Sequence, residues 1–363
     1  MTYVSPFSSP SASPSPSASP ASPSIERVLL LLAAGFGLVP EAVEEGPSGT
    51  ATRNYLATTP DARRWFVKTH PAGTDPERAE SAARLSEYAR LCRVPVARAR
   101  ATLDGDRLVA SWAGVTVSVT EYVADAVTAD GRLSGRAWEA VGEAVGRLHR
   151  GLARHPFGPP RQAGRDRAVD PVRGRDRLSE LVRRYEAEPP RTGFERWALE
   201  TARERLAALP ATRRLLERVP ERMLAQLVHG DLSGPNVLLR GERVAAVIDF
   251  APPGLRGPVW ELGRLALDPH TVLTHTDWPT GLARLAAVYH DLHPAVPVAE
   301  LLSVVRLHAA YLGCTVYPLN TVIEGLGPVT PSLESYARAR VRAAAVLRDR
   351  LDEAEELLRA SLR

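Results

Sequence analysis

The sequence predicts an α+β fold of two lobes, a small β-rich N-lobe followed by a larger, mainly α-helical C-lobe. From about Val43 to Val123 the chain shows alternating apolar and polar residues, whereas beyond Val123 apolar residues recur every three or four positions. A chain of 363 residues is long enough to bury a sizeable core in each lobe. We expect a tail over residues 1–24, an N-lobe over 25–122 and a C-lobe over 123–363.

The first 24 residues are mostly Ser, Pro and Ala, and none carries a charged side chain. Such a segment buries too little surface to offset the entropy of ordering, so we expect it to be disordered. The apolar stretch Val28–Val39 is too short to span a membrane. We interpret it as a first helix that faces the core, with the hydrophobic region of an unusual signal peptide as the alternative.

The rest of the N-lobe reads as strands with one intervening helix. Its first two strands flank Pro60-Asp61-Ala62, a combination typical of a hairpin turn. Val115, Val117 and Val119 alternate with polar residues, which is the period of a half-buried strand. In chain order we expect strands at Tyr55–Thr59 and Arg64–Lys68, a helix at Glu77–Leu91, and strands at Leu108–Trp112 and 115–119.

The C-lobe pattern places a polar loop beside the end of a hairpin. Leu227-Val228 predicts a short strand that leads into the loop His229–Asn236. Two further strands around Gly241 would then return the chain to Asp249, next to this loop. Upstream, an amphipathic helix is indicated by an apolar stripe at Trp138, Val141, Val145, Leu148 and Leu152.

We therefore expect three polar side chains to lie close together, those of Asp231, Asn236 and Asp249. An Asn amide oxygen and an Asp carboxylate are hard oxygen ligands of the kind that Mg²⁺ prefers. A second carboxylate beside them can take a proton from a hydroxyl group or orient that hydroxyl for attack. We expect phosphoryl-transfer chemistry at this loop, with Asp231 as the base.

The stretch from His229-Gly230-Asp231 to Asn236, followed by Ile248-Asp249-Phe250, resembles the aminoglycoside phosphotransferase family, which includes choline, homoserine and similar small-molecule kinases. The resemblance covers most of the chain from about residue 25 and implies a bilobal, protein-kinase-like fold. It also implies ATP or GTP as donor, Mg²⁺, Asp231 as catalytic base, and Asn236 and Asp249 as metal ligands. Protein kinases usually have His-Arg-Asp and a later Ala-Pro-Glu, so their absence here favours a small-molecule acceptor.

Lys68 is the only lysine among 46 basic residues, and it falls where the family places its phosphate-binding lysine. A compact ammonium group there could reach the α- and β-phosphates. The resemblance also implies a partner acid on the following helix. Glu80 is our choice and Glu77 the alternative, because the sequence does not fix the helix register to one turn.

Two further segments correspond to nucleotide-binding parts of the family. Gly46–Tyr55 resembles the loop that covers the nucleotide, where backbone amides or Ser48 could contact phosphates. Glu121–Val123 would be the hinge between the lobes, and backbone groups of Glu121 and Val123 could bind adenine. An ordinary flexible turn is the alternative for the first segment.

The chain departs from the family pattern at two positions. Ala251 follows Asp249-Phe250 where Gly is common, which concerns the flexibility of the loop more than metal binding. Glu261 stands where the family often has Asp, at a position that usually supports the catalytic loop. We expect His149 to be a structural, hydrogen-bonding histidine.

The hydrophobic content of 44% and the charged content of 24% lie in the ordinary range of soluble proteins. The net charge is +4, but the arginines are spread among many acids, so we expect no nucleic-acid partner. We expect no membrane partner either. Two cysteines are too few for a disulfide framework, and they favour a reduced, cytoplasmic setting. The oligomeric state stays open.

The acceptor pocket of this family is built largely from the C-lobe after the metal-binding Asp. Between Leu255 and Ser335 seven acids outnumber four arginines, and several aromatic residues lie among them. An acidic, aromatic wall would suit a cationic acceptor such as an aminoglycoside, although solvated acids and core aromatics are the plainer interpretation. We expect most histidines of this segment to lie on helix surfaces or in caps.

We therefore expect an ATP- or GTP-dependent phosphotransferase that acts on a small-molecule hydroxyl group. An aminoglycoside or another cationic metabolite or antibiotic is one acceptor class, and homoserine, choline, a sugar or Ser/Thr of a natural-product peptide are alternatives. A nucleotide-binding pseudokinase that acts as a scaffold is the alternative from another class.

Overall fold

The computed structural model describes residues 24–46 and 53–363, which form two compact units. Unit 1 runs to Pro76 and includes Ala101–Val119, and unit 2 comprises Glu77–Arg100 and Thr120–Arg363. The tail expected to be disordered lies, except for Ser24, outside the described residues, and so does Ser48. The lobe boundaries that the sequence predicts stay a prediction.

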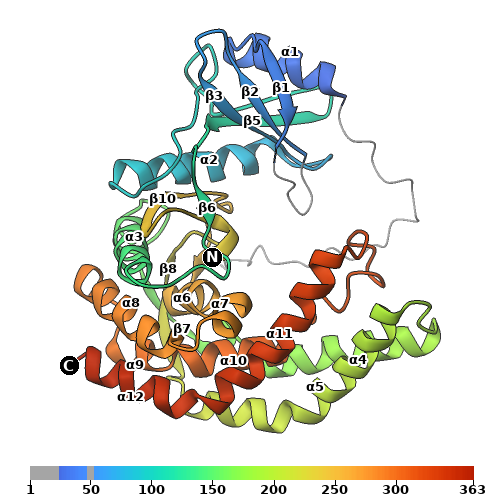
Figure 1. The fold of residues 1–363 in the computed structure, drawn as a ribbon, viewed down its shortest axis with the longest axis vertical. Coiled ribbons are helices and arrows are strands. Elements are labelled where there is room, and N and C mark those ends of the chain that lie inside the picture. Colours follow the sequence, from blue (N-terminus) through green and yellow to red (C-terminus); the bar gives the residue numbers. More distant parts are fainter. Residues whose placement is uncertain (1–23, 47–52) are drawn as a thin grey trace, which may run out of the picture. The chain divides into compact units, whose positions relative to one another are not determined.

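Unit 1 is a five-stranded sheet with one helix, and its strand order is β1-β2-β3-β5-β4 (Figure 1). The apolar stretch near the start of the chain forms α1, and Val28, Leu32 and Phe36 of this helix are buried against the sheet. This confirms the core-facing helix. The elements are α1 Ile25–Phe36, β1 Ala42–Glu45, β2 Asn54–Thr58, β3 Arg64–Thr69, β4 Val109–Trp112 and β5 Val115–Glu121, whose end enters unit 2.

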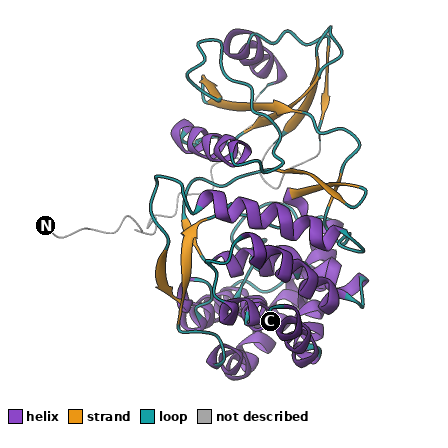
Figure 2. Cartoon of the chain, turned by 90° about the vertical axis from the view of Figure 1, so that its left-hand side faces the viewer, coloured by secondary structure: helices purple, strands orange, loops and turns teal. Residues whose placement is uncertain are grey.

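Unit 2 is mainly helical, with short strands that carry its loops (Figures 1 and 2). Its first half contains α2 Pro76–Leu91, β6 Val127–Thr128, α3 Ala137–Leu152, β7 Arg161–Gly164, η1 Arg165–Arg167, α4 Pro171–Ala187, α5 Gly193–Glu217 and β8 Arg222–Leu227. Its second half contains η2 Gly234–Asn236, β9 Val237–Arg240, β10 Arg243–Val247, β11 Leu255–Arg256, α6 Pro258–Ala266, α7 Pro269–Thr274, α8 Trp278–Leu292, α9 Val298–Leu302, α10 Val304–Cys314, α11 Pro331–Asp349 and α12 Leu351–Ser361.

The core of unit 2 is centred on α3 and α8. The apolar stripe predicted for α3 is buried along its whole length, from Trp138 to Leu152. Helix α8 approaches closely because Gly281 faces Trp138, and a Cβ atom at Gly281 would lie 2.2 Å from the indole ring. Gly142 of α3 in turn packs against the backbone of Leu285. Small residues on both helices thus let the large ones be covered completely.

The predicted loop connects two three-stranded sheets. The first has the strand order β11-β8-β7, and its strand β8 ends at Leu227, just before the loop. The other has the order β10-β9-β6 and contains the predicted hairpin, with Val247 paired to Val237. No helix among the described residues is long and apolar enough to cross a membrane.

Candidate active site

His229 forms the base of the loop that follows β8, and its side chain is fully buried. Its Nε2 lies 2.9 Å from the carbonyl oxygen of Ile248, and its Nδ1 accepts a hydrogen bond from the Asp231 amide at 3.2 Å. The ring is therefore neutral with its proton on Nε2, in keeping with a pKa of His229 that burial lowers. This histidine ties the loop to the segment that carries Asp249.

The Asp231 carboxylate is more than half exposed and lies 2.8 Å from the guanidinium group of Arg264 on α6. Arg264 is itself mostly buried, with its guanidinium carbon 5.0 Å from the centre of the Trp260 ring. The ion pair orients the carboxylate and keeps one of its oxygens engaged. Arg264 is not among the site residues expected from the sequence. The available signal was its spacing of three residues from Glu261, which puts both on one helix face toward the loop.

Asn236 and the segment that carries Asp249 are hydrogen-bonded to the same loop as Asp231. The amide nitrogen of Asn236 donates to the backbone oxygen of Asp231 at 2.8 Å, which leaves its amide oxygen as the candidate ligand atom. The Ile248 amide donates to the backbone oxygen of Asn236 at 3.0 Å. Asp249 is exposed and has φ +63°, a left-handed conformation that Asp tolerates better than most residues. The donor set, an amide oxygen and a carboxylate, suits Mg²⁺.

Glu261 supports the catalytic loop by accepting hydrogen bonds from its backbone, as expected from the sequence. Its buried carboxylate accepts the amides of His229 at 3.1 Å and Gly230 at 2.5 Å. It also accepts the Nε2 proton of His149 at 3.1 Å, while the Tyr289 hydroxyl lies 2.9 Å from Nδ1 of that ring. Burial opposes ionisation, but the hydrogen bond from His149 and the other donors outweigh it and lower the pKa of Glu261. The structural role expected of His149 is confirmed.

Gly230 and Ala251 lie against each other where the two segments meet. Gly230 has φ +92°, and a Cβ atom there would lie 2.6 Å from the Cβ of Ala251. The Ala251 amide donates to the backbone oxygen of His229 at 3.0 Å, which fixes this contact. Ala251, in place of the common Gly, thus fills the space that Gly230 leaves.

The residues expected to bind the nucleotide are distributed over both units. In unit 1, Lys68 is half-buried on β3, opposite Asn54 of β2. In unit 2, Glu80 is buried on α2 with its carboxylate 2.8 Å from Arg84, whereas Glu77 is exposed. A partnership of either acid with Lys68 stays a prediction.

The hinge residues lie in unit 2. The backbone amide of Glu121 donates to the oxygen of Arg98 at 2.9 Å, so its carbonyl is the group that could meet a base. Val123 follows in a loop and is half-buried. Their role in adenine binding stays a prediction, and Ser48 lies outside the described residues.

Most acids of the 255–335 segment have internal partners, so the acidic wall considered from the sequence is not a free surface. Besides Glu261, Asp268 caps α7, Glu300 accepts the Leu224 amide at 2.8 Å, and Glu334 pairs with Arg338 at 2.6 Å. As expected for most of the histidines, His275 and His293 are the C-cap residues of α7 and α8, whereas His308 is buried within α10. The net charge of a segment does not show which of its charged side chains are paired or buried in the folded protein.

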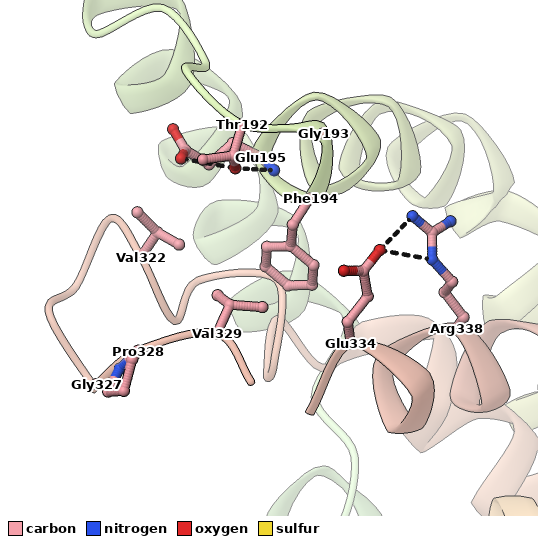
Figure 3. A pocket seen from close by; sticks show the side chains of 10 residues that line it. All are labelled: Thr192, Gly193, Phe194, Glu195, Val322, Gly327, Pro328, Val329, Glu334 and Arg338. Carbon is pink, nitrogen blue, oxygen red and sulfur yellow. Dashed lines mark hydrogen bonds and ion pairs between the residues drawn. The ribbon is translucent and has the colours of Figure 1, made fainter. Parts of the chain in front are cut away.

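A pocket of about 610 Å³ lies at the N-terminal ends of α5 and α11 (Figure 3). Phe194 and Val329 face its interior, and the Glu334–Arg338 pair closes one side. None of the residues discussed above for phosphoryl transfer lines it. We therefore place the candidate active site at the loop around Asp231 and not at this pocket.

Comparison with known proteins gives a consistent result. A model of the phosphotransferase enzyme family matches residues 42–302, whereas no curated protein matches the chain. Among solved structures, an amicoumacin kinase in complex with AMP-PNP, Ca²⁺ and Ami is 16% identical, with a TM-score of 0.59 over 88% of this chain and 93% of that one.

Two other solved structures are similar to the same extent. A choline/ethanolamine kinase family protein from Mesorhizobium loti is 19% identical, with a TM-score of 0.58 over 93% of this chain and 99% of that one. A spectinomycin phosphotransferase in complex with ADP and spectinomycin is 14% identical, with a TM-score of 0.54 over 93% of this chain and 98% of that one. These likenesses confirm the protein-kinase-like α+β fold.

Proposed function

Because this chain belongs to the phosphotransferase enzyme family, we propose that it transfers the γ-phosphate of ATP or GTP to a hydroxyl group of a small molecule. The observation that supports the proposal is the hydrogen bonding of Asp231, Asn236 and the backbone next to Asp249 into one loop, held by the buried His229 and Glu261. This arrangement offers a base for the acceptor and hard oxygen ligands for a cation.

Each residue of the site has a distinct role in the proposal. Asp231 takes the proton of the acceptor hydroxyl or orients it, while Arg264 holds the carboxylate in place. Asn236 and Asp249 would hold Mg²⁺, which supplies positive charge against the phosphates when it is bound. The strained backbone at Asp249 supports this role, because such conformations cluster at functional sites.

The nucleotide residues complete the proposal by way of the family resemblance. Lys68 would contact the phosphates, with Glu80 as its partner acid and Ser48 in the covering loop. Glu121 and Val123 would bind the base through their backbone groups. ATP and GTP are both candidates for the phosphate donor. The cytoplasmic setting expected from the sequence stays a prediction, and we propose no oligomeric state.

For the acceptor we keep the classes that the sequence suggests. Solved structures of the same fold are named for spectinomycin, amicoumacin and choline or ethanolamine. An aminoglycoside or another cationic metabolite is thus one candidate. Homoserine, sugars and Ser/Thr of a natural-product peptide are the others. We propose neither a nucleic acid nor a membrane as partner.

The test is phosphotransfer by the wild type and by Asp231→Ala across a panel of these acceptors. We expect at least a 100-fold loss of turnover in the variant, because a positioned base contributes about 10²- to 10⁴-fold. Nucleotide binding and melting temperature should change little. Asp176→Ala removes another exposed, Arg-paired carboxylate, on α4, and serves as the control.

Near-normal transfer by Asp231→Ala with the true acceptor would exclude Asp231 as the base. A pseudokinase scaffold would be indicated instead if the wild type bound ATP but transferred phosphate to no acceptor and to no water molecule. Phosphate on a peptide, and on no sugar, amine or amino acid of the panel, would select the peptide-kinase alternative.

A further inference from the structure

Arg340, on α11 in unit 2, is a buried cation, and one edge of its guanidinium group forms no hydrogen bond with the described residues. Its side chain is 4% exposed, and its Nη1 donates to the Tyr336 hydroxyl at 3.2 Å. Its Nε and Nη2 are buried, and neither has a hydrogen-bond partner among the residues that the structure describes. Buried polar groups are almost always paired, and an unpaired charged donor is costly, so this edge calls for an explanation.

The unfilled pair of atoms is the edge by which arginines bind carboxylates side-on. The chain itself provides the comparison. Arg350 presents Nε and Nη2 to the two carboxylate oxygens of Glu353 at 2.8 and 2.6 Å. Arg183 does the same to Glu180 at 2.9 and 2.6 Å. Arg340 therefore has the geometry of a carboxylate receptor whose carboxylate is not part of the described chain.

Arg340 and the neighbouring Arg205 also have no carboxylate counterion among the described residues. Burial, followed by the charge of Arg340, lowers the pKa of Arg205 to about 9. Burial, followed by Arg340 and Arg264, lowers the pKa of His308 to about 3. An anion bound here would relieve all of these repulsions.

A continuous wall of rings and guanidinium groups connects Arg340 with the candidate active site. Arg264, the partner of Asp231, lies over Trp260, whose ring centre is 6.1 Å from that of Tyr311. The guanidinium carbon of Arg340 lies 5.5 Å from the Tyr311 ring centre. Trp260 and Tyr311 are half-buried, so part of each residue is exposed to solvent.

We propose that the acceptor carries a carboxylate group, which the Nε–Nη2 edge of Arg340 binds while the acceptor's hydroxyl group lies at Asp231. The inference rests on the proposed phosphotransfer and names the class of its acceptor: a hydroxy acid, including amino acids and sugar acids. Two aromatic rings separate the receptor from Arg264, with steps of 5.0, 6.1 and 5.5 Å from Arg264 to Trp260, Tyr311 and Arg340. An amino group on the same acceptor is compatible with it.

The test uses matched acceptor pairs that differ only in the carboxylate. Homoserine is compared with 3-aminopropan-1-ol, and gluconate with sorbitol, in the wild-type chain with ATP and Mg²⁺. Aminoglycosides serve as carboxylate-free cations, and glycerol phosphate against glycerol tests for a phosphate in place of the carboxylate. We expect kcat/KM to be at least tenfold higher for the carboxylated member of a pair.

Arg340→Gln should raise KM for the carboxylated acceptor at least tenfold with a much smaller change in kcat, and so abolish the preference. Arg340→Lys should restore only part of it, because an ammonium group cannot bind side-on. Arg338→Gln is the matched control, two residues away on the same helix, exposed and paired with Glu334. It should leave both constants unchanged. If Arg340→Gln does not fold, the acceptor pairs still decide with the wild type.

The inference fails if carboxylated acceptors are not used, if the neutral members are used equally well, or if only the phosphate pair shows a preference. It also fails if Arg340→Gln keeps the preference. ATP hydrolysis without acceptor gives a separate readout of the proposed function. Hydrolysis without a carboxylate preference overturns the inference alone, whereas the absence of both hydrolysis and transfer overturns the proposed function.

Discussion

Gly230 illustrates how single atoms shape the catalytic loop. The residue combines a left-handed backbone with a Cβ position that Ala251 already occupies, so two separate physical reasons exclude any side chain. Its amide is also one of the donors to Glu261. A substitution here therefore disturbs the support of Asp231 and not its chemistry.

We expect Gly230→Ala to lower the free energy of unfolding by several kcal/mol, because overpacking costs about 1–3 kcal/mol and the left-handed conformation adds about 1–2 kcal/mol. Turnover should fall with it as Asp231 shifts. Chemical denaturation and initial rates measure the two effects.

Gly241→Ala separates the two causes. Gly241 has φ +59° in the β9–β10 turn, but no atom of the described residues lies within 4 Å of an added Cβ. This variant should show the backbone cost alone and keep its activity. The double variant Gly230→Ala/Ala251→Gly should recover the steric part. Equal destabilisation by Gly230→Ala and Gly241→Ala would show that the contact with Ala251 is unimportant.

At the scale of elements, the packing of α8 on α3 holds the frame behind the active site. His149 of α3 and Tyr289 of α8 belong to the network that ends at Glu261. A change in the distance between the two helices would therefore affect the catalytic loop through the side chains of Tyr289, His149 and Glu261. Gly281 sets this distance, because the indole of Trp138 lies where its side chain would be.

Gly281→Ala should destabilise the chain by about 1–3 kcal/mol, because Trp138 is fully buried and cannot move aside. The melting temperature and the urea midpoint measure this loss. Gly193→Ala, at the start of α5 in open space, should instead be neutral or slightly stabilising. An unchanged midpoint for Gly281→Ala would show that the helices can separate at little cost.

The elements themselves could be read from the sequence, because their patterns are local. The hairpin strands, the buried stripe of α3 and the loop between β8 and β9 all lie close to their predicted positions. Arg340 could not be recognised in this way, and Arg264 only through its spacing of three residues from Glu261. Each is one arginine among many, and its meaning depends on which helix face meets which neighbour. That is decided by tertiary packing, which periodicity does not reveal.

On the scale of the whole molecule, the positive charge of unit 2 is partly internal. Arg205 and Arg340 are buried, and burial together with the charges of Arg340 and Arg264 keeps the buried His308 uncharged. Stability should therefore depend on pH in a direction that follows from these groups.

His308 makes this dependence testable. Its folded-state pKa is about 3 against an ordinary value of 6.5, so between these values only the unfolded chain binds the proton. Stability should then fall as the pH falls from 6.5, by about 1.4 kcal/mol per pH unit at most. His308→Gln, which does not titrate, should remove this part, worth about 3 kcal/mol at pH 4. Parallel pH profiles of wild type and variant would contradict it.

Lys68 has a practical consequence. The chain carries a single ε-amino group, and it lies on β3, half-buried. A reagent selective for lysine can therefore modify only one side chain of this protein. Acylation, carbamylation or attachment of a fluorophore at lysine would report on the β3 strand alone.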